Sequence, residues 1–395
     1  MKQLSVQVSF VGDDNAVLTK DVPGDLSSVS VAAVLEVMER AVPCLRHLSV
    51  LCPYLLDEEV AWCPLTRTLR SLLNAAPASL ITRHTDVECS FTQAHKMMTR
   101  EAPFGSLSLR LLVLRADWAA ESDEEGDDTD DADDEHARFM AFTNDMALCP
   151  SLHEVALANA RGYNTAVAIP AFVDVALAND VTALHFLGCD LLPSSLASLA
   201  RLVRRLDHFV LSCGLLFDMI NGPVFCDEFC AALRFNTVMV CLTLSHTGLW
   251  NHPFAGRAVV DALAGHPSIR YLNLCGNVVA SGERIFVGAC LARLITANAP
   301  SFKKLDRSGC ELHDDGKRPI FNALSGNLCL RRLCCDENSI TFPLAREVVM
   351  PSILRNVTLR ELKIGSEEGE PVLADFLTMF DALGQRTLVS VQTNP

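Results

Sequence analysis

Apolar residues recur along the chain in a nine-residue pattern, L-x-x-L-x-L-x-x-N/C/T. Two clear copies are Ile269-Arg-Tyr-Leu272-Asn-Leu274-Cys-Gly-Asn277 and Leu330-Arg-Arg-Leu333-Cys-Cys335-Asp-Glu-Asn338. Good copies begin at Val181 and Phe302. Weaker ones begin at Leu45, Leu109, Leu152, Leu206, Met239 and Leu359, with a truncated copy at Leu388. Short apolar alternation of this kind, bounded by turn residues, predicts one short β-strand in each copy.

The spacing of the copies predicts a repeat architecture. Successive starting positions lie 64, 43, 29, 25, 33, 30, 33, 28, 29 and 29 residues apart, so the common period is about 29. The remainder of each period has apolar residues at helical spacing, and amphipathic helices are expected at 257–263, 283–297, 319–324 and 371–383. One strand and one helix cannot bury both of their apolar faces alone, so the units must stack.

The two large gaps each have an explanation in the sequence. The gap of 43 contains an acidic run from Glu121 to Glu135, with eleven acids and no base, which predicts a disordered insertion at about 119–137. The gap of 64 is roughly two periods. A degenerate copy beginning at Leu80 would fill it, with Arg83 and Thr85 in place of two leucines.

Residues 1–42 fall outside the repeat. The sequence pattern predicts a β-hairpin over Leu4 to Phe10 and Ala16 to Val22, and a helix over Val29 to Ala41. Since terminal repeats need a cap, we expect an N-terminal cap at 1–42 and a solenoid at 43–395.

The repeat resembles the leucine-rich repeat, and specifically the long repeats of the ribonuclease-inhibitor-like subclass. The marker of that subclass is a helix end L-x-x-N-x-x-L leading into the strand. It occurs here as Leu233-Arg-Phe-Asn236-Thr-Val-Met239, Leu324-Ser-Gly-Asn327-Leu-Cys-Leu330 and Ile353-Leu-Arg-Asn356-Val-Thr-Leu359, with His266 in the same place in one further repeat. The resemblance implies an α/β fold, a curved horseshoe of 10–11 repeats with a parallel concave sheet and outer helices. The ninth residue of the pattern, Asn, Cys or Thr, is expected to bond backbone groups of the turn.

Charge changes the functional reading. The chain carries a net charge of −15, most of it in the acidic run, so nucleic acid and an anionic membrane surface are not expected as partners. The most apolar run, 166–178, is interrupted by Pro170 and Asp174 and is too short to span a bilayer, so membrane insertion is not expected either. The acidic run is either a solvated loop, a docking segment for a basic partner, or a tether that competes for a basic surface of the same protein.

A column of bases crosses the repeats, because the residue directly after the starting apolar position is Arg or Lys in six copies. We expect a basic ridge on the concave edge, with Tyr271 as a candidate exposed aromatic anchor beside it. The candidate partner-binding residues are Arg270, Tyr271, Lys303, Lys304, Arg331, Arg332, Arg360 and Lys363. Such a column is either a solvated repeat edge, a recognition strip for an acidic protein surface, or a dock for the acidic run.

Metal and catalytic signals are weak. Cys226 and Cys230 lie one helical turn apart, but no second pair completes a zinc set, so buried structural thiols are favoured. There is no motif of a conventional active site, and neither an enzyme nor a cofactor is expected. Sixteen cysteines spread through apolar runs indicate reduced thiols, hence a cytoplasmic protein. Of these, Cys334 is a candidate exposed thiol, and Trp250 a second candidate aromatic anchor.

The sequence therefore predicts a non-enzymatic scaffold or adaptor that holds another protein, with an acidic surface, on the concave strand face. The resemblance also leaves room for a regulator of an enzyme, because ribonuclease inhibitor and the Ran GTPase activators share this repeat type. A structural subunit of a large assembly is a third alternative.

Overall fold

The computed structural model describes the backbone of five strands before residue 129, and then 129–148, 152–158, 167–189, 191–212, 216–217, 224–366, 378 and 388–393. The chain forms two compact units, Met1–Leu184 and His185–Pro395. Candidate site residues fall in the second unit.

The first unit begins with the predicted hairpin. The strands β1 (Leu4–Phe10) and β2 (Val17–Val22) pair antiparallel, and β1 also pairs antiparallel with β3 (Leu45–Leu51). The next strands then add in parallel: β4 (Thr85–Ser90), β5 (Leu111–Arg115) and β6 (Glu154–Ala158). The helix expected at 29–41 lies outside the described residues.

The acidic insertion is partly helical. The helix α5 (Thr129–Met146) begins inside the acidic run. We expected residues 119–137 to be disordered, but from residue 129 onward the structure is helical. Acidic residues in a first helical turn interact favourably with the helix dipole, which accounts for this start. Further along α5, Phe139 is fully buried and packs on Phe172 of α6 (Ala168–Ala178), with ring centroids 5.8 Å apart.

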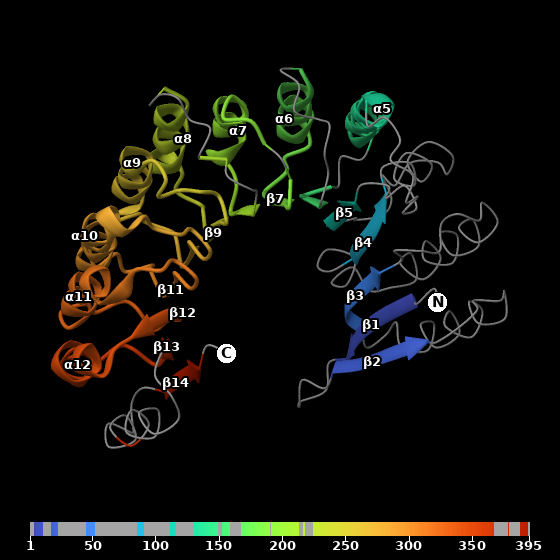
Figure 1. Ribbon diagram of the computed structural model, residues 1–395. Coiled ribbons are helices and arrows are strands. Elements are labelled where there is room, and N and C mark those ends of the chain that lie inside the picture. Colours follow the sequence, from blue (N-terminus) through green and yellow to red (C-terminus); the bar gives the residue numbers. More distant parts are fainter. Residues whose placement is uncertain are drawn as a thin grey trace. The chain divides into compact units, whose positions relative to one another are not determined.

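The second unit consists of parallel strands alternating with helices. Its strands pair in chain order, and in Figure 1 the helices of this unit lie on one side of the strands. The strands are β8 (His208–Ser212), β9 (Cys241–Ser245), β10 (Tyr271–Asn273), β11 (Lys304–Asp306), β12 (Arg332–Ile340), β13 (Glu361–Ser366) and β14 (Leu388–Thr393). The helices are α7 (Ser195–Val203), α8 (Val224–Phe235), α9 (Pro253–Leu263), η3 (Ser281–Glu283), α10 (Arg284–Thr296), α11 (His313–Leu324), α12 (Phe342–Leu344), η4 (Ala345–Val349) and α13 (Met350–Arg355). The short β7 (Ala183–Leu187) lies at the division between the units.

A row of apolar side chains runs through the sheet of the second unit. The second apolar position of each copy pairs in register with that of the next, and every member of the row is fully buried: Phe209, Leu242, Leu272, Leu305, Leu333 and Leu362. The repeated apolar pattern therefore places its residues as predicted. The α/β fold class, a solenoid-like stack of strand–helix units, is confirmed.

The register differs from the prediction near both ends. Val87 of β4 pairs with Leu112, so this copy begins near residue 84 and not at Leu80. Val50, and not Leu48, shares the rung of Val87, which shifts the copy assigned to Leu45 by two residues. Likewise Val389 pairs with Leu362, so the last copy begins two residues before Leu388.

The polar ninth position behaves as predicted. The buried Asn277 Nδ2 donates to the backbone oxygens of Leu244 and Leu274 at 2.7 and 2.8 Å, and the thiol of Cys310 donates to Leu274 O at 3.4 Å. The preceding glycines, Gly276 and Gly309, have φ of +68° and +63°, a conformation that side chains with a Cβ rarely adopt. Each turn is thus bonded to its own strand and to the neighbouring repeat.

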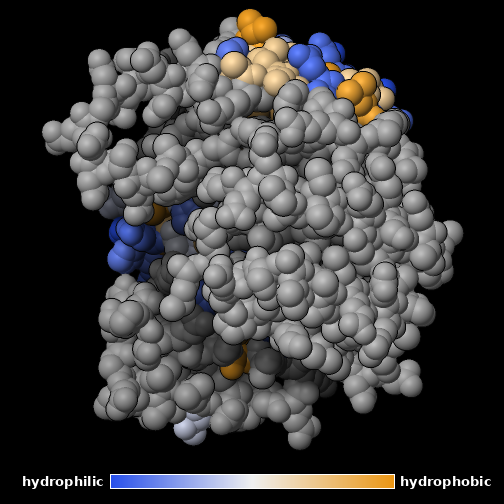
Figure 2. Space-filling model, turned by 90° about the vertical axis from the view of Figure 1, so that its right-hand side faces the viewer, coloured by the Kyte–Doolittle hydropathy of each residue, from blue (hydrophilic) through white to orange (hydrophobic). Residues whose placement is uncertain are grey.

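Three of the four expected segments, 257–263, 283–297 and 319–324, are helical, and α9 begins at Pro253, four residues before its expected start. The helix expected at 371–383 lies outside the described residues apart from Thr378. Apolar spacing predicted the positions of α9 and α10, but α11 begins at His313 and not at Pro319. Asp314 and Asp315 in its first turn favour the earlier start. Figure 2 shows hydrophobic and hydrophilic residues interspersed over the coloured surface at the top of the view.

Candidate protein-binding surface

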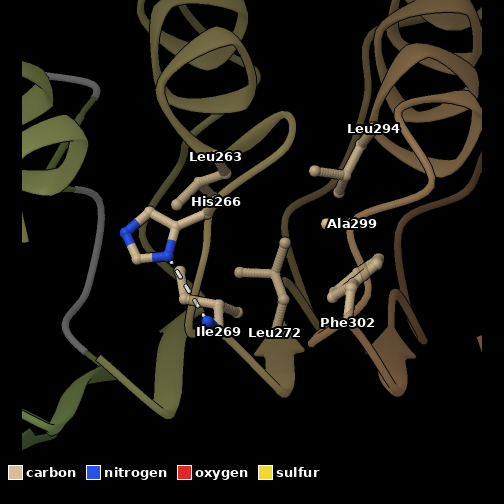
Figure 3. A pocket seen from close by; sticks show the side chains of 7 residues that line it. All are labelled: Leu263, His266, Ile269, Leu272, Leu294, Ala299 and Phe302. Atoms are coloured by element: carbon tan, nitrogen blue, oxygen red, sulfur yellow. Dashed lines mark hydrogen bonds between the residues drawn. The ribbon is translucent and has the colours of Figure 1, made fainter. Parts of the chain in front are cut away.

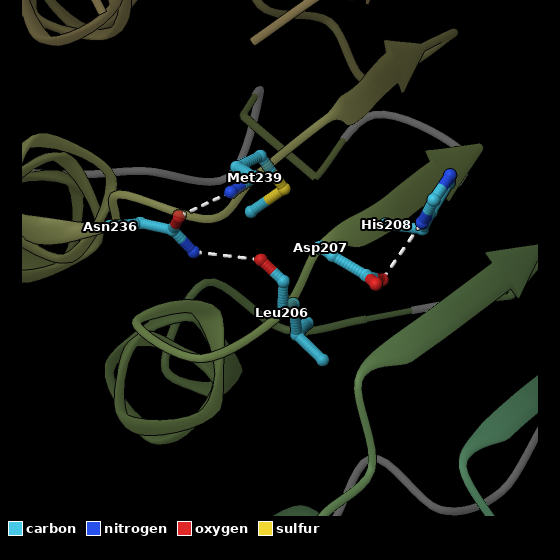
Figure 4. Close-up of polar contacts among 5 residues, drawn as sticks. All are labelled: Leu206, Asp207, His208, Asn236 and Met239. Atoms are coloured by element: carbon cyan, nitrogen blue, oxygen red, sulfur yellow. Dashed lines mark hydrogen bonds and ion pairs between the residues drawn. The ribbon is translucent and has the colours of Figure 1, made fainter. Parts of the chain in front are cut away.

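In several repeats the turn from the helix into the strand is held by one buried polar side chain. Asn236 Oδ1 accepts from the backbone N–H of Val238 at 2.7 Å and of Met239 at 2.6 Å, and its Nδ2 donates to Leu206 O at 2.8 Å (Figure 4). Asn327 and Asn356 make the same bonds in their own turns. Each amide therefore fixes one turn and connects it to the previous repeat.

His266 performs this task in one repeat that lacks the asparagine. Its Nδ1 accepts from the N–H of Ser268 and Ile269 at 3.4 and 3.3 Å, and its Nε2 lies 3.1 Å from Leu233 O. In Figure 3, His266 lines an apolar space together with Leu263, Ile269, Leu272, Leu294, Ala299 and Phe302. The cavity holds about 10 Å³, room for about one water-sized sphere, and is a packing defect too small for a ligand.

The structure brings four of the predicted ridge residues into one column. Lys303 N–H donates to Arg270 O at 2.9 Å, Arg331 N–H to Lys303 O at 2.9 Å, and Arg360 N–H to Arg331 O at 2.7 Å. The next residue of each strand donates to the same carbonyl, so a continuous backbone ladder connects the four positions. We call Arg270, Lys303, Arg331 and Arg360 the basic ridge.

The ridge side chains face solvent. Arg270, Arg331 and Arg360 are exposed, and Lys303 is half-buried with its Nζ donating to Pro300 O at 2.5 Å. Among the residues that the structure describes, no carboxylate forms an ion pair with Arg270, Arg331 or Arg360. Their charge is therefore presented outward and is not neutralised locally.

The second column of predicted bases lies on the sheet and is already engaged. Tyr271, Lys304, Arg332 and Glu361 pair in register on successive strands. Lys304 Nζ lies 4.3 Å from the centroid of the Tyr271 ring, and Arg332 Nε lies 2.5 Å from Glu361 Oε2. Burial, and then the nearby Asp306 carboxylate, raise the pKa of Tyr271 to about 12. Tyr271 is half-buried, so it contributes a partly exposed ring to the sheet surface.

Lys363 lies on a third row, where it pairs in register with Cys334. The predicted exposure of Cys334 is wrong: the side chain is 4% exposed, and burial raises the pKa of its thiol to about 12. Burial outweighs the charges of Lys304 and Lys363, which act on the pKa of this thiol in the opposite direction. Cys334 is therefore no reactive group on the surface.

Trp250 is also buried, with 1% of its surface exposed. A Cβ added at Gly256 of α9 would lie 2.4 Å from the Trp250 ring, so the ring lies directly against the backbone of that helix. The expectation that Trp250 anchors a partner is thus overturned. The other two tryptophans, Trp62 and Trp118, lie outside the described residues.

The thiols of Cys226 and Cys230 lie 3.6 Å apart and are both buried in α8. Their hydrogen bond lowers the pKa of Cys226 and raises that of Cys230. No group of three or more His, Cys, Asp or Glu side chains able to hold a metal occurs in the part of the chain that the structure describes. The pair belongs to the packing between α8 and α9, since the Cys226 thiol lies 3.9 Å from Ala255 O.

One exposed feature was missed at the sequence level. In the four copies that begin at Ile269, Phe302, Leu330 and Leu359, the chain carries an exposed apolar residue two positions before the start, at the tip of the helix-to-strand turn: Pro267, Pro300, Leu328 and Val357. In three of the four copies this residue directly follows the turn asparagine or histidine, and in the fourth Pro300 follows Ala299. It was overlooked because the repeat pattern was defined by buried positions.

Comparison with known proteins adds little to this surface. No model of a known protein family matches the chain, and no curated protein matches it. Among solved structures, it is similar to the crystal structure of a Bacteroides fragilis protein from a structural genomics consortium. The two share 12% identity over 87% of this chain and 93% of the other, with a TM-score of 0.39. Within the described residues, every helix is too short or too polar to cross a bilayer.

Proposed function

We propose that this chain is a leucine-rich repeat protein of the ribonuclease-inhibitor-like subclass that acts as a non-enzymatic scaffold or adaptor. Its basic ridge holds an acidic surface of another protein. The observation that carries this proposal is the column of four stacked bases in a chain whose net charge is −15.

The geometry of the ridge favours recognition by charge. Adjacent strands lie about 4.8 Å apart, so the four ridge positions fall within about 15 Å. Like charges this close repel one another, and an acidic partner relieves that repulsion. Complementary charge of this kind mainly raises association rates and selects between partners.

Two further observations support the family and its setting. The buried turn asparagines Asn236, Asn327 and Asn356 occupy the marker position of the L-x-x-N-x-x-L pattern and bond the turns of successive repeats. The described cysteines are free thiols, which fits a reducing compartment such as the cytoplasm.

The test is a quantitative pull-down from native lysate with the full chain. The variant carries R270E, K303E, R331E and R360E, which lower the net charge by eight. A matched control carries R234E, R257E, R318E and R346E, with the same change of charge on the helices α8, α9, α11 and η4. Circular dichroism checks that both variants fold.

Loss of a captured partner from the ridge variant alone supports the proposal. Retention by both variants moves recognition away from the ridge, and equal loss from both assigns the effect to net charge. Either of these two results contradicts the proposed site.

A further inference from the structure

The edge around the ridge contains no acidic residue. We define the basic edge as the four helix-to-strand turns with their ridge residues, at 265–270, 297–303, 326–331 and 355–360. These segments contain the four ridge bases and Arg355, which is also exposed, but not one Asp or Glu. In a chain with 48 acids and 33 bases, this is a strongly basic surface.

The turns of the basic edge are bonded to one another, so the edge is preorganised. Ser301 Oγ donates to His266 O at 3.0 Å, Cys329 Sγ to Asn298 O at 3.3 Å, and Thr358 Oγ1 to Asn327 O at 3.2 Å. Leu328 N–H donates to Asn298 Oδ1 at 2.8 Å. A partner bound here meets a surface whose backbone is already ordered, which lowers the entropic cost of binding.

A second row runs along the same edge beside the ridge. Leu328 is 66% exposed and Val357 is 54% exposed, and Pro267 and Pro300 occupy the equivalent exposed positions. We call these four residues the apolar row. Each lies three residues before a ridge base, so the two rows are at most about 10 Å apart.

We propose that the occupant of the basic edge is an α-helix of the partner protein, lying across the repeats, with an acidic stripe on the ridge and an apolar stripe on the apolar row. This inference rests on the proposed function and names the element that the partner presents. Removing the apolar row from water gives a helix a contact that charge alone does not supply.

The spacing of the rungs selects a helix over an extended strand. Along an α-helix, side chains on the same face recur every 5.4 Å, whereas adjacent strands, and hence successive ridge bases, lie about 4.8 Å apart. Over the three intervals between the four bases the mismatch is about 2 Å. Long Arg and Lys side chains absorb that difference. In an extended peptide, side chains on the same face recur every 6.6 Å or more. Over three intervals the mismatch with the ridge bases is about 5 Å, as large as the distance between two strands.

The width of the edge agrees with this assignment. A helix with its side chains has a diameter of about 10–12 Å, which covers both rows at once. Four rungs correspond to about three helical turns, so acids at positions i, i+4, i+7 and i+11 align with the four ridge bases.

The test uses a fluorescein-labelled, hydrocarbon-stapled helical peptide of 16 residues and the full-length protein. The peptide carries Glu at positions 1, 5, 8 and 12 and Leu at 2, 6, 9 and 13. A control peptide keeps the same Glu and Leu positions but has no staple, and a proline at its centre breaks the helix. Fluorescence anisotropy measures the dissociation constant of each.

Two neutral protein variants test the apolar row. L328S with V357S removes its most exposed aliphatic side chains, while F254S with I285S removes residues that are 84% and 63% exposed on α9 and α10. We expect the first variant to weaken binding of the stapled peptide about tenfold. We expect the second to change it by less than about twofold, as is normal for substitutions outside an interface.

The helix assignment is overturned if the broken peptide binds as tightly as the stapled one, or if the apolar-row variant binds normally. A ridge-dependent partner in the lysate, together with no binding of the stapled peptide, also overturns the helix while the proposed function stands. Failure of the ridge variant to lose its partner would remove the proposed function instead.

Discussion

His266 makes the stability of the fold depend on pH, because a titratable ring stands where other repeats have an asparagine. Its Nδ1 accepts two backbone hydrogen bonds, which a protonated ring cannot do. Burial is the main cause that lowers its pKa below the usual value of about 6.5. The folded state therefore holds the neutral ring, and the unfolded chain binds the proton first as the pH falls. The stability contributed by the neutral ring is fully present above about pH 6.5 and is lost progressively as the pH falls from there toward the lowered pKa of the folded state.

We expect H266N to remove this dependence, since asparagine makes the equivalent bonds at Asn236, Asn327 and Asn356. Between pH 7.5 and 5, the free energy of unfolding of the native chain should fall by more than that of the variant. Urea unfolding at each pH measures the difference. The exposed His153, changed to Asn, serves as the control and should follow the native chain. Parallel pH profiles of the native chain and H266N would refute the assignment.

At the scale of elements, two glycines set the distance between α10 and α11. A Cβ at Gly288 would lie 2.0 Å from Gly316 O, and one at Gly316 would lie 2.7 Å from Arg284 O. Only residues without a side chain permit this approach of the two backbones. We expect G288A to destabilise the protein by about 1–3 kcal/mol, because the helices must separate.

Gly326 offers a matched control in the adjacent turn, since an added Cβ there meets nothing within 4 Å. G326A should change the free energy of unfolding by no more than about 0.5 kcal/mol. Urea unfolding of both variants tests the pair. Similar losses in the two variants would show that the tight crossing is relaxed in solution.

The elements also show which parts of the fold the sequence could predict. From Leu109 to Leu359 the apolar pattern predicted the strand positions, because buried leucines repeat at a nearly constant period. It misplaced the copy near Leu80, since Thr85 and its neighbours carry little apolar signal. An arginine at a leucine position, Arg307, is nevertheless fully buried, which composition alone does not predict.

The candidate surface was predictable only as far as it follows the repeat. The ridge was predicted because Arg270, Lys303 and their equivalents recur at one offset from a buried position. The pairing of Arg332 with Glu361 depends on a contact between repeats, which has no signature in a single copy. The burial of Trp250 depends on its packing against the backbone of α9 at Gly256, which the apolar pattern of the strands does not encode. The residues of the apolar row also recur at one offset from a buried position, but they can be recognised as a surface feature only once their exposure is known.

At the scale of the whole molecule, the ridge is a local positive feature in a negative field. An acidic helix approaching the protein is repelled by the net charge of −15 at long range and attracted by the ridge at contact. Salt screens both interactions, with a Debye length of about 30 Å at 0.01 M and about 10 Å at 0.1 M. Salt therefore weakens mainly the attraction in a protein that has the ridge, and mainly the repulsion in one that lacks it.

This balance predicts opposite salt responses for the native chain and the ridge variant R270E, K303E, R331E and R360E. Between 0.02 and 0.2 M NaCl, the affinity of the native chain for the stapled acidic peptide should fall roughly threefold to tenfold, as contact attraction is screened. In the ridge variant, repulsion outweighs the attraction of the remaining Arg355, so its weak residual binding, retained through the apolar row, should strengthen with salt. Anisotropy titrations across the salt series measure both slopes. If both proteins lose affinity in parallel, the attraction does not come from the ridge, and bases elsewhere on the molecule hold the peptide.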